Sequence, residues 1–437
     1  MKASILASLL SRAESHRKAG RRKRAKFAYQ EILEKHSQST EAHFQLAILL
    51  FHEHDFEGAV RHFQCLLQLS PELAEIHFNL GTVLAMLGRN QQAAESFERA
   101  ISLQPSMADA HNNLGIALGE LGNIERAITS FESAIQHSPR FVAALLNLGT
   151  TLIEARCLVR AVEVCRIARD LDPDLADTHL ALGLALELAG EDVEAIQSFQ
   201  EAVRRNPQSA DWQFHFAAFI GLEAPAIAPR DYVASLFDTY AAQFDKHLRG
   251  SLRYQTPEHI LKAVLAAAPD QMFDILDLGC GTGLCGELFR PFASRIVGVD
   301  LSSEMIRVAN NRSCYDALEV NDIVGFLKNQ TARSDLILAA DVFVYVGDLS
   351  ETFQLSSAAL RANGLFAFSV EAADAIPNAP TSSVGYHLNR SRRYSHSLAY
   401  IRQLATKHEF FEHSVTLESL RTQGGQDVQG WIVVLEK

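Results

Sequence analysis

The chain has 437 residues, of which 48% are hydrophobic and 21% are charged, and its formal net charge is −12. This composition is that of ordinary globular protein, and the length predicts two or three domains. The acidic balance argues against a non-specific nucleic-acid binder, because binding to phosphates relies on clustered Lys and Arg. We interpret the one basic run, residues 17–24, as a solvated helix face rather than an RNA or membrane patch.

The cysteines and the apolar segments indicate the cellular compartment in which we expect the protein. The six cysteines form no CxxC pair and no regular framework, which is typical of reduced thiols in a cytoplasm and suggests no metal site. The apolar start, residues 5–10, is too short for the apolar region of a signal peptide. No stretch approaches the roughly 20 apolar residues of a membrane span. We therefore expect a cytoplasmic protein without a membrane span.

The first half of the chain repeats itself every 34 residues. Leu-Gly pairs begin at 80, 114, 148 and 182, alanine recurs at 59, 93, 127, 161 and 195, and proline recurs at 71, 105, 139, 173 and 207. Small residues let two antiparallel helices approach closely and proline ends the second helix, so each block predicts a helical pair that stacks on the next. The pattern resembles the tetratricopeptide repeat (TPR) family.

The predicted TPR domain covers residues 1–222. Clear repeats run from about 40 to 209, and a degenerate first repeat with Ala25 and Tyr29 in phase precedes them. A final helix begins near residue 210. The two ends are interpreted as caps, which a stacked array needs because each repeat buries its face only against its neighbours.

Two polar series recur within the repeats. We interpret the first as packing rather than a metal cluster, because stacked repeats hold its members apart; it consists of His43, His77, His111 and His179. The second lies on the first helix of each pair and consists of Gln45, Asn79, Asn113 and Asn147. In arrays that resemble those of O-linked N-acetylglucosamine transferases, such amides line the concave groove and hold a peptide backbone. Ala181 breaks the series here, and both peptide binding and a purely structural role stay open.

A linker at residues 221–230, with two prolines, breaks the repeat and places the start of a second domain at 223, extending to 437. Beyond it, apolar runs alternate with helical stretches. Strands are predicted at 273–278, 295–299, 317–320, 335–340 and 365–370, with helices at 284–290, 303–311 and 349–361. This alternation predicts a parallel, doubly wound sheet.

A glycine-rich loop follows the first predicted strand. The run from Asp277 to Gly283 reads DLGCGTG, and its glycines allow a tight turn and close approach of a ligand at the opening of a helix. The second strand ends at Asp300, whose carboxylate can accept two hydrogen bonds from ribose hydroxyls. Residues 281–286 also spell GxGxxG, the dinucleotide signature, so an NAD-type enzyme is the competing interpretation.

Three features favour methyl transfer: Asp277 within the DxGxGxG form, the third-strand segment 318–322, and two predicted strands at 409–417 and 430–435 joined by a Gly-rich loop. From about 230 to 437 the sequence resembles class I S-adenosylmethionine-dependent methyltransferases, in the branch of predicted bacterial enzymes that carry TPR repeats. Segments 236–248, 254–257 and 393–397 are similar to that branch. The resemblance implies an all-α TPR superhelix followed by an α/β Rossmann-like fold whose parallel sheet is closed by an antiparallel hairpin.

The resemblance also implies a cofactor, S-adenosylmethionine (SAM), and the residues that bind it. The residues around its methionine end would be Asp277, Gly279, Cys280 by its backbone, Gly281 and Gly283. The residues around its adenosine end would be Asp300 on the ribose, Leu301 on the adenine, Asp322 on the adenine amino group and Ile323 through its backbone. Ala340 and Asp341 would face the sulfonium and the substrate.

Methyl transfer from a sulfonium is an in-line displacement, so alignment can supply much of the rate. A base is needed only when the acceptor must lose a proton, and the candidates are Asp341, Glu371 and His396. Tyr240 and Tyr254 could fold over the cofactor and exclude water. Tyr394 could help to shape the acceptor pocket.

The segment after the fourth strand, residues 341–345, lacks the [DNS]PP[YF] motif of amino-group methylases, and the domain has no Pro-Cys nucleophile of cytosine-C5 enzymes. A small molecule, a glycan or lipid-linked intermediate, or a protein held by the TPR groove stays open as methyl acceptor. We favour a small-molecule or glycan acceptor, with the TPR array recruiting a protein or peptide. The alternative is a TPR scaffold whose second domain senses SAM or is catalytically silent.

Overall fold

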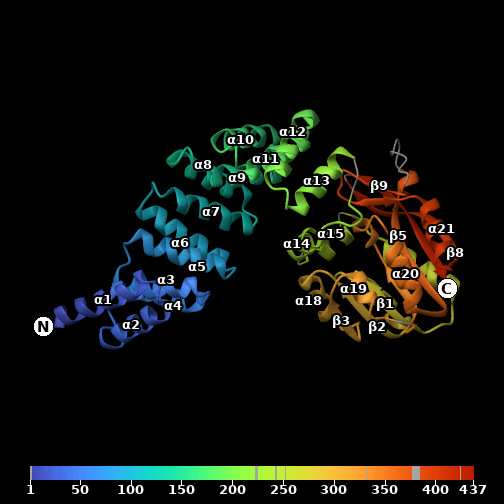
Figure 1. Cartoon of the computed structure of the whole chain (residues 1–437), viewed down its shortest axis with the longest axis horizontal. Helices are drawn as coiled ribbons and strands as arrows, with labels where there is room; N and C mark the ends of the chain where they lie inside the picture. Colours follow the sequence, from blue (N-terminus) through green and yellow to red (C-terminus); the bar gives the residue numbers. More distant parts are fainter. Residues whose placement is uncertain are drawn as a thin grey trace. The chain divides into compact units, whose positions relative to one another are not determined.

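The computed structural model describes residues 2–221, 225–241, 244–250, 252–330, 332–375, 384–423 and 425–437. The chain divides into two compact units, Met1–Asn206 and Pro207–Lys437 (Figure 1). The domain boundary predicted between 222 and 223 lies outside the described residues, as do Ala242 and Gln243 of the segment 236–248 and Gly424 of the loop predicted between the last strands. Among the described residues, no helix is both long and apolar enough to cross a bilayer.

The first unit consists of paired helices, as the repeat predicts. They are α1 (Lys2–Lys18), α2 (Arg22–Lys35), α3 (Thr40–His52), α4 (Phe56–Leu69), α5 (Ala74–Met86), α6 (Asn90–Leu103), α7 (Ala108–Glu120), α8 (Ile124–His137), α9 (Val142–Glu154), α10 (Leu158–Leu171), α11 (Ala176–Ala189) and α12 (Asp192–Arg205). The helices α1 and α2 form the predicted degenerate first repeat. Buried alanines and phenylalanines at the repeated positions make up the core of this unit.

The repeated glycine permits close packing within each pair. A Cβ added to Gly115 would lie 2.6 Å from the Phe131 ring, and one added to Gly183 would lie 2.8 Å from the Phe199 ring. In the repeat where cysteine replaces the phenylalanine, a Cβ on Gly149 would lie 2.6 Å from Cys165 Sγ. In these three repeats the glycine lets the side chain of the second helix rest directly on the backbone of the first, whereas the α3–α4 pair has Ala47 at that position.

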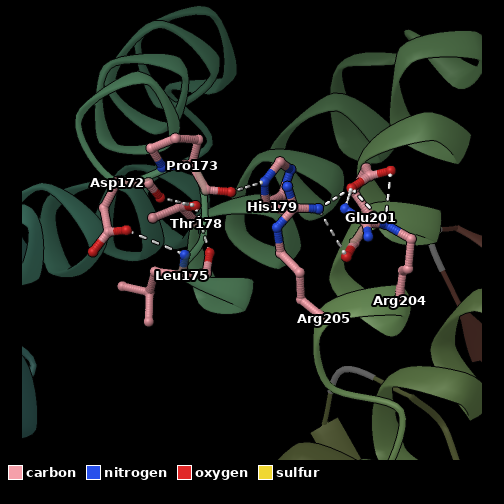
Figure 2. A network of polar contacts seen from close by, with 8 residues as sticks. All are labelled: Asp172, Pro173, Leu175, Thr178, His179, Glu201, Arg204 and Arg205. Carbon is pink, nitrogen blue, oxygen red and sulfur yellow. Dashed lines mark hydrogen bonds and ion pairs between the residues drawn. The ribbon is translucent and has the colours of Figure 1, made fainter.

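The recurrent histidines tie four of the helical pairs to the turn that precedes each of them. In every case the ring Nε2 donates to a carbonyl oxygen six residues earlier, at 2.9 Å; the pairs are His43 with Ser37, His77 with Pro71, His111 with Pro105, and His179 with Pro173. Figure 2 shows the last pair beside Thr178, whose Oγ1 donates to the Leu175 carbonyl at 2.7 Å. Each of these carbonyls belongs to the residue just after the C-cap of the preceding helix, in the turn between two helices, so this series has a structural role.

The second unit is an α/β fold. Its helices are α13 (Ala210–Ile220), α14 (Arg230–Tyr240), α15 (Phe244–Gly250), α16 (Thr256–Ala267), α17 (Leu284–Phe289), α18 (Ser303–Asn311), α19 (Ile323–Leu327), α20 (Ser350–Ala359) and α21 (Leu398–Lys407). Its strands are β1 (Phe273–Leu278), β2 (Ala293–Asp300), β3 (Ala317–Val320), β4 (Ser334–Ala339), β5 (Leu360–Ala372), β6 (Tyr386–Leu388), β7 (Tyr394–His396), β8 (Phe411–Gln423) and β9 (Gln426–Glu436). All five strands predicted before residue 371 are present.

The strand order is β3-β2-β1-β4-β5-β7-β6, and strands β1 to β5 run parallel. Strand β9 pairs antiparallel with β5, and β8 pairs antiparallel with β9, so the predicted closing hairpin is confirmed. The short strands β6 and β7 were not predicted. Since the parallel strands end at one edge, the loops after β1 to β5 meet there.

Both faces of the sheet are buried, which a parallel sheet requires. Along β5, Phe366 and Phe368 belong to the apolar cluster that includes α20 and α21, whereas Ala367 belongs to the cluster that includes α16 and α17. A third cluster joins Phe214 of α13 to Tyr345 and Tyr394 near the edge of the sheet where the loops after the parallel strands meet, which we call the ligand edge because parallel sheets bind ligands there. The helix α13 is thus part of the wall around that edge.

Candidate active site

The loop after β1 has the geometry of a ligand cradle. Gly279 has a φ of +64° and Gly283 has a φ of +93°, values that side chains rarely adopt. A Cβ on Gly279 would also lie 2.5 Å from Val342 Cγ2. The loop therefore brings bare backbone to the start of α17, where backbone N–H groups can face a ligand.

The loop is fastened to Asp300 at the end of β2. The backbone N–H of Gly281 donates to Asp300 Oδ2 at 2.9 Å, and that of Ser302 donates to Oδ1 at 2.8 Å. Burial raises the pKa of the Asp300 carboxyl, and these backbone hydrogen bonds oppose the rise. A carboxylate has about four acceptor sites, so Asp300 keeps capacity to accept a hydrogen bond from a ligand hydroxyl.

Asp277 lies under the glycine loop and is 1% exposed. Tyr315 Oη donates to Asp277 Oδ2 at 2.6 Å and accepts from the Gly286 backbone N–H at 3.1 Å. Burial raises the pKa of the Asp277 carboxyl to about 7. Tyr315 was not predicted as a site residue, because nothing in the motif indicates which side chain will reach Asp277.

Asp322, after β3, begins α19. Its Oδ1 accepts from the Gly325 backbone N–H at 2.7 Å, so it is the N-cap of that helix. Its Oδ2 accepts from Arg230 of α14 at 3.0 Å. The carboxylate thus has two protein partners as well as a position at the ligand edge of the sheet.

The loop after β4 carries a buried polar cluster. Asp341 has a φ of +55°, and its backbone N–H donates to Ser369 Oγ at 2.8 Å. The Ser369 hydroxyl donates in turn to Asp341 Oδ1 at 3.0 Å. Arg421 of β8 donates to Asp341 Oδ2 at 3.3 Å and also to Glu371, and it is 3% exposed.

Arg421 was not predicted, because its position depends on an irregularity. The pairing of β8 with β9 shifts register between Ser419 and Arg421, so that Leu420 and Arg421 are both buried although they are neighbours along a strand. A bulge re-aims a side chain in this way, and bulges occur often beside active sites. A strict alternation would place the two side chains on opposite faces.

A cavity of about 1160 Å³ in the second unit joins these features. Its lining includes most of the predicted residues: Asp277, Gly279, Cys280, Gly281, Asp300, Leu301, Asp322, Ile323, Ala340, Asp341, Tyr240 and Tyr254. It exceeds the roughly 300–1,000 Å³ typical of a site for one small ligand, so it has room for a cofactor and an acceptor together. The rest of the wall is mostly apolar and includes Phe237, Phe244 and Leu248.

Four residues that the sequence analysis singled out lie outside this lining: Gly283, Glu371, His396 and Tyr394. His396 is fully buried, its Nε2 donates to the Gly347 carbonyl at 3.0 Å, and burial lowers the pKa of its imidazole to about 4. Tyr394 donates to the Pro225 carbonyl at 2.6 Å. Glu371 is paired with Arg421.

In the first unit, the four amides of the predicted ladder are half-buried. Asn147 Nδ2 donates to Asn112 Oδ1 at 2.9 Å, and Asn112 Nδ2 donates to Asn113 Oδ1 at 3.2 Å. Gln45 donates to Glu41 at 3.0 Å. Part of the series therefore links successive repeats through Asn112, whereas binding of a peptide by these amides stays a prediction.

Comparisons with known proteins agree with this organisation. The methyltransferase domain family matches residues 244–425, and the tetratricopeptide repeat family matches residues 7–39, 38–106, 112–176 and 168–210. An uncharacterized methyltransferase of Schizosaccharomyces pombe is 25% identical over 154 residues, which cover 30% of this chain and 54% of the relative. A ubiquinone biosynthesis O-methyltransferase of Actinobacillus pleuropneumoniae is 28% identical over 103 residues, which cover 22% of this chain and 44% of the relative.

The chain spans about half the length of the curated relatives it matches. Among solved structures, PilW, a widely conserved type IV pilus biogenesis factor, is similar at 20% identity and a TM-score of 0.43, over 48% of this chain and 97% of PilW. The fold and the loops of the second unit define a Rossmann-like ligand-binding domain. The chain combines tetratricopeptide repeats with a methyltransferase domain, as the sequence predicts.

Proposed function

We propose that this protein is a SAM-dependent methyltransferase that acts on a small-molecule, glycan or lipid-linked acceptor, and that residues 1–222 recruit a protein or peptide to a cytoplasmic catalytic domain at 223–437. One observation carries the proposal: the loops after β1, β2, β3 and β4 bring Gly281, Asp300, Asp322 and Asp341 to the wall of one cavity in a methyltransferase domain. These are the residues that the resemblance assigns to the cofactor and the reacting groups.

The residues present fit the cofactor. The positive-φ backbone at Gly279 leaves no room for a side chain, so that the backbone itself faces the ligand. Asp300 has lone pairs for ribose hydroxyls, and Leu301 and Ile323 supply apolar surface beside it. When bound, SAM would supply a methyl group activated by its sulfonium. Asp277, below the same loop, would face the positively charged methionine end.

Asp341 is the candidate base that lines the cavity. Its backbone and carboxylate are held by Ser369, and Arg421 donates to its other oxygen, so its orientation is fixed from two sides. An oriented carboxylate can accept the proton that an acceptor hydroxyl loses during methyl transfer. Alignment of the acceptor against the apolar wall would supply the remaining contribution to the rate.

The cavity walls support a small acceptor with an apolar body. Phe237, Phe244, Leu248 and Leu252 line the cavity, and Asp341 and Arg421 are among its polar lining residues. Known small-molecule sites have this character, with apolar walls and few polar groups. The O-methyltransferase among the relatives supports a hydroxyl oxygen as the acceptor atom.

Calorimetric titration of the full chain with SAM tests the proposal. We expect saturable binding by the wild type and an affinity lower by about tenfold or more in Asp300→Ala, because hydrogen bonds to a charged group are lost. Asp316→Ala is the matched control, since Asp316 also accepts from a backbone N–H, that of Ile296, but lies outside the cavity lining. Failure of the folded wild type to bind SAM would overturn the proposal.

A further inference from the structure

Residues 225–241 and 244–250 include α14 and α15 (Figure 1), and α14 packs beside α18, the helix that follows β2. We call these residues the strap. Its inner side chains, Phe237, Tyr240 and Phe244, line the same cavity as Gly281 and Asp300. The Phe237 ring lies 5.9 Å from the Phe244 ring and 5.5 Å from the Tyr345 ring, so the aromatic side chains form a continuous surface.

The strap begins at a fixed backbone anchor. The Ala226 carbonyl accepts from the Gly347 N–H at 2.8 Å and from the Asp348 N–H at 2.9 Å, and the Ala228 N–H donates to the Tyr345 carbonyl at 3.0 Å. By contrast, α14 has no fully buried side chain. Its half-buried side chains Tyr232, Val233 and Phe237 pack against the apolar cluster that includes Phe214, and polar contacts add to this packing.

Those polar contacts reach each of the three loops assigned to the cofactor. Arg230 pairs with Asp322 at 3.0 Å, after β3. Asp238 Oδ1 accepts from the Ser302 hydroxyl at 2.5 Å and from the Glu304 N–H at 3.2 Å, after β2.

The third contact is made by α15. Asp245 Oδ1 accepts from the Thr282 hydroxyl at 2.5 Å, within the glycine loop, and its other oxygen pairs with Arg312. Thr282 lies between Gly281 and Gly283, and Ser302 follows Leu301 directly. Each contact therefore falls on a residue next to, or identical with, one that we assign to SAM.

We propose that the strap covers the cofactor site formed by the loops after β1, β2 and β3. Arg230, Asp238 and Asp245 hold α14 and α15 against these three loops and so retain the bound cofactor; we call these three residues the latches. This inference rests on the proposed function. The latches are polar and partly exposed, so each contributes modestly and can open. Opening occurs about the anchor at 226–228 and lets the cofactor leave; closure slows its exit.

The test measures cofactor exchange, so it needs no knowledge of the methyl acceptor. The dissociation rates of SAM and S-adenosylhomocysteine are measured by surface plasmon resonance on the immobilised full chain. In Arg230→Ala the dissociation rate is expected to rise about two- to fivefold, the range for one partly exposed ion pair. In Arg230→Ala combined with Asp238→Ala it is expected to rise about tenfold or more, because charge-assisted bonds are lost as well.

The matched control is Arg402→Ala, because Arg402 pairs with Glu412 at 2.7 Å with an exposure close to that of Arg230 but outside the cavity lining. It should leave the dissociation rate unchanged. Added salt should speed dissociation from the wild type more than from Arg230→Ala, because salt screens the ion pair. A structural role alone would not produce that difference.

The outcomes separate the two proposals. Equal dissociation rates in the wild type and the double variant, with both proteins binding, would overturn the latches and leave the proposed function standing. Absence of binding by the wild type would overturn the proposed function and the latches with it. If the double variant fails to fold, the single Arg230→Ala variant decides, since the Arg230 side chain is 57% exposed and its removal leaves the core intact.

Discussion

The two units of this protein arrange their charged groups differently. In the first unit, ion pairs link neighbouring repeats: Arg126 pairs with Glu98 and Arg160 pairs with Glu132, both across 28 residues, and all four side chains are well exposed. In the second unit, Arg421 reaches Asp341 across 80 residues and is buried.

This difference indicates that the two sets of charged groups have different roles, one in the stability of the array and the other at the candidate site. Exposed pairs between repeats are worth little individually, and the array is stable because the same apolar packing recurs in every repeat. A buried cluster of charges costs desolvation energy and is tolerated where geometry and chemistry require it. The cluster of Arg421, Asp341 and Glu371 lies beside the candidate cavity, which accords with a role in the reaction rather than in folding.

Removal of the buried guanidinium is the largest effect we predict. In Arg421→Met the carboxylates of Asp341 and Glu371 lose their shared partner, and the second unit should be destabilised by about 3–5 kcal/mol. Both tryptophans, Trp212 and Trp431, lie in this unit, so tryptophan fluorescence during urea unfolding reports on it alone.

The counterpart in the first unit is Arg126→Met, which breaks an exposed pair and should cost less than about 1 kcal/mol. Unfolding of the first unit is the loss of helical circular dichroism that occurs without a change in tryptophan fluorescence, because both tryptophans lie in the second unit. Similar losses of free energy in the two variants would contradict the contrast between local, exposed pairs and the buried cluster.

A second prediction concerns the packing on which the repeats depend. Gly115→Ala places a methyl group 2.6 Å from the Phe131 ring and should destabilise the first unit by about 1–3 kcal/mol through overpacking. Gly119 lies on the same helix, α7, with nothing within 4 Å of an added Cβ. Gly119→Ala should therefore stabilise the unit by up to about 1 kcal/mol, because alanine has the higher helix propensity. The order of the two melting temperatures checks this, and a reversed order would refute the packing argument.

Much of the fold was predictable because its signals are local. The spacing of Gly115 and Phe131 recurs every 34 residues, and the run from Asp277 to Gly283 combines a strand, a turn and a helix start within a few residues. In such segments the contacts that decide the structure lie between residues close in sequence. Asp300 was predictable for the same reason, since it ends the next strand.

The rest of the candidate site depends on contacts that no local pattern encodes. Arg230 meets Asp322 across 92 residues, and Tyr315 meets Asp277 across 38 residues. Arg421 faces inward because of the irregular pairing after Ser419, which alternation alone would not predict. The residue type of His396 suggests a base, yet the structure buries His396 against the Gly347 carbonyl, away from the cavity lining.

A third prediction, smaller than the first two, contrasts a buried acid of the second unit with a half-buried acid of the first, Glu194. Burial raises the pKa of the Asp277 carboxyl from its ordinary 3.8 to about 7. Between these values the folded state binds the proton more tightly than the unfolded state, so wild-type stability falls as the pH rises from about 4 to about 7. Asp277→Asn cannot ionise and can still accept from Tyr315, so at pH 8 it should be more stable than the wild type by about 1–2 kcal/mol.

The contribution of Glu194 to stability depends on pH with the opposite sign. The Arg166 hydrogen bond lowers the pKa of the Glu194 carboxyl, so its contribution is present above the ordinary pKa and is lost as the pH falls through the lowered value. Glu194→Gln should therefore be slightly less stable than the wild type at pH 8, and the difference should vanish in acid. Urea unfolding at several pH values, followed by fluorescence for Asp277→Asn and by circular dichroism for Glu194→Gln, measures both. If the stability of Asp277→Asn relative to the wild type does not rise between pH 5 and pH 8, the pKa of the buried carboxyl is not raised. The contrast between the two units would then not extend to single acids.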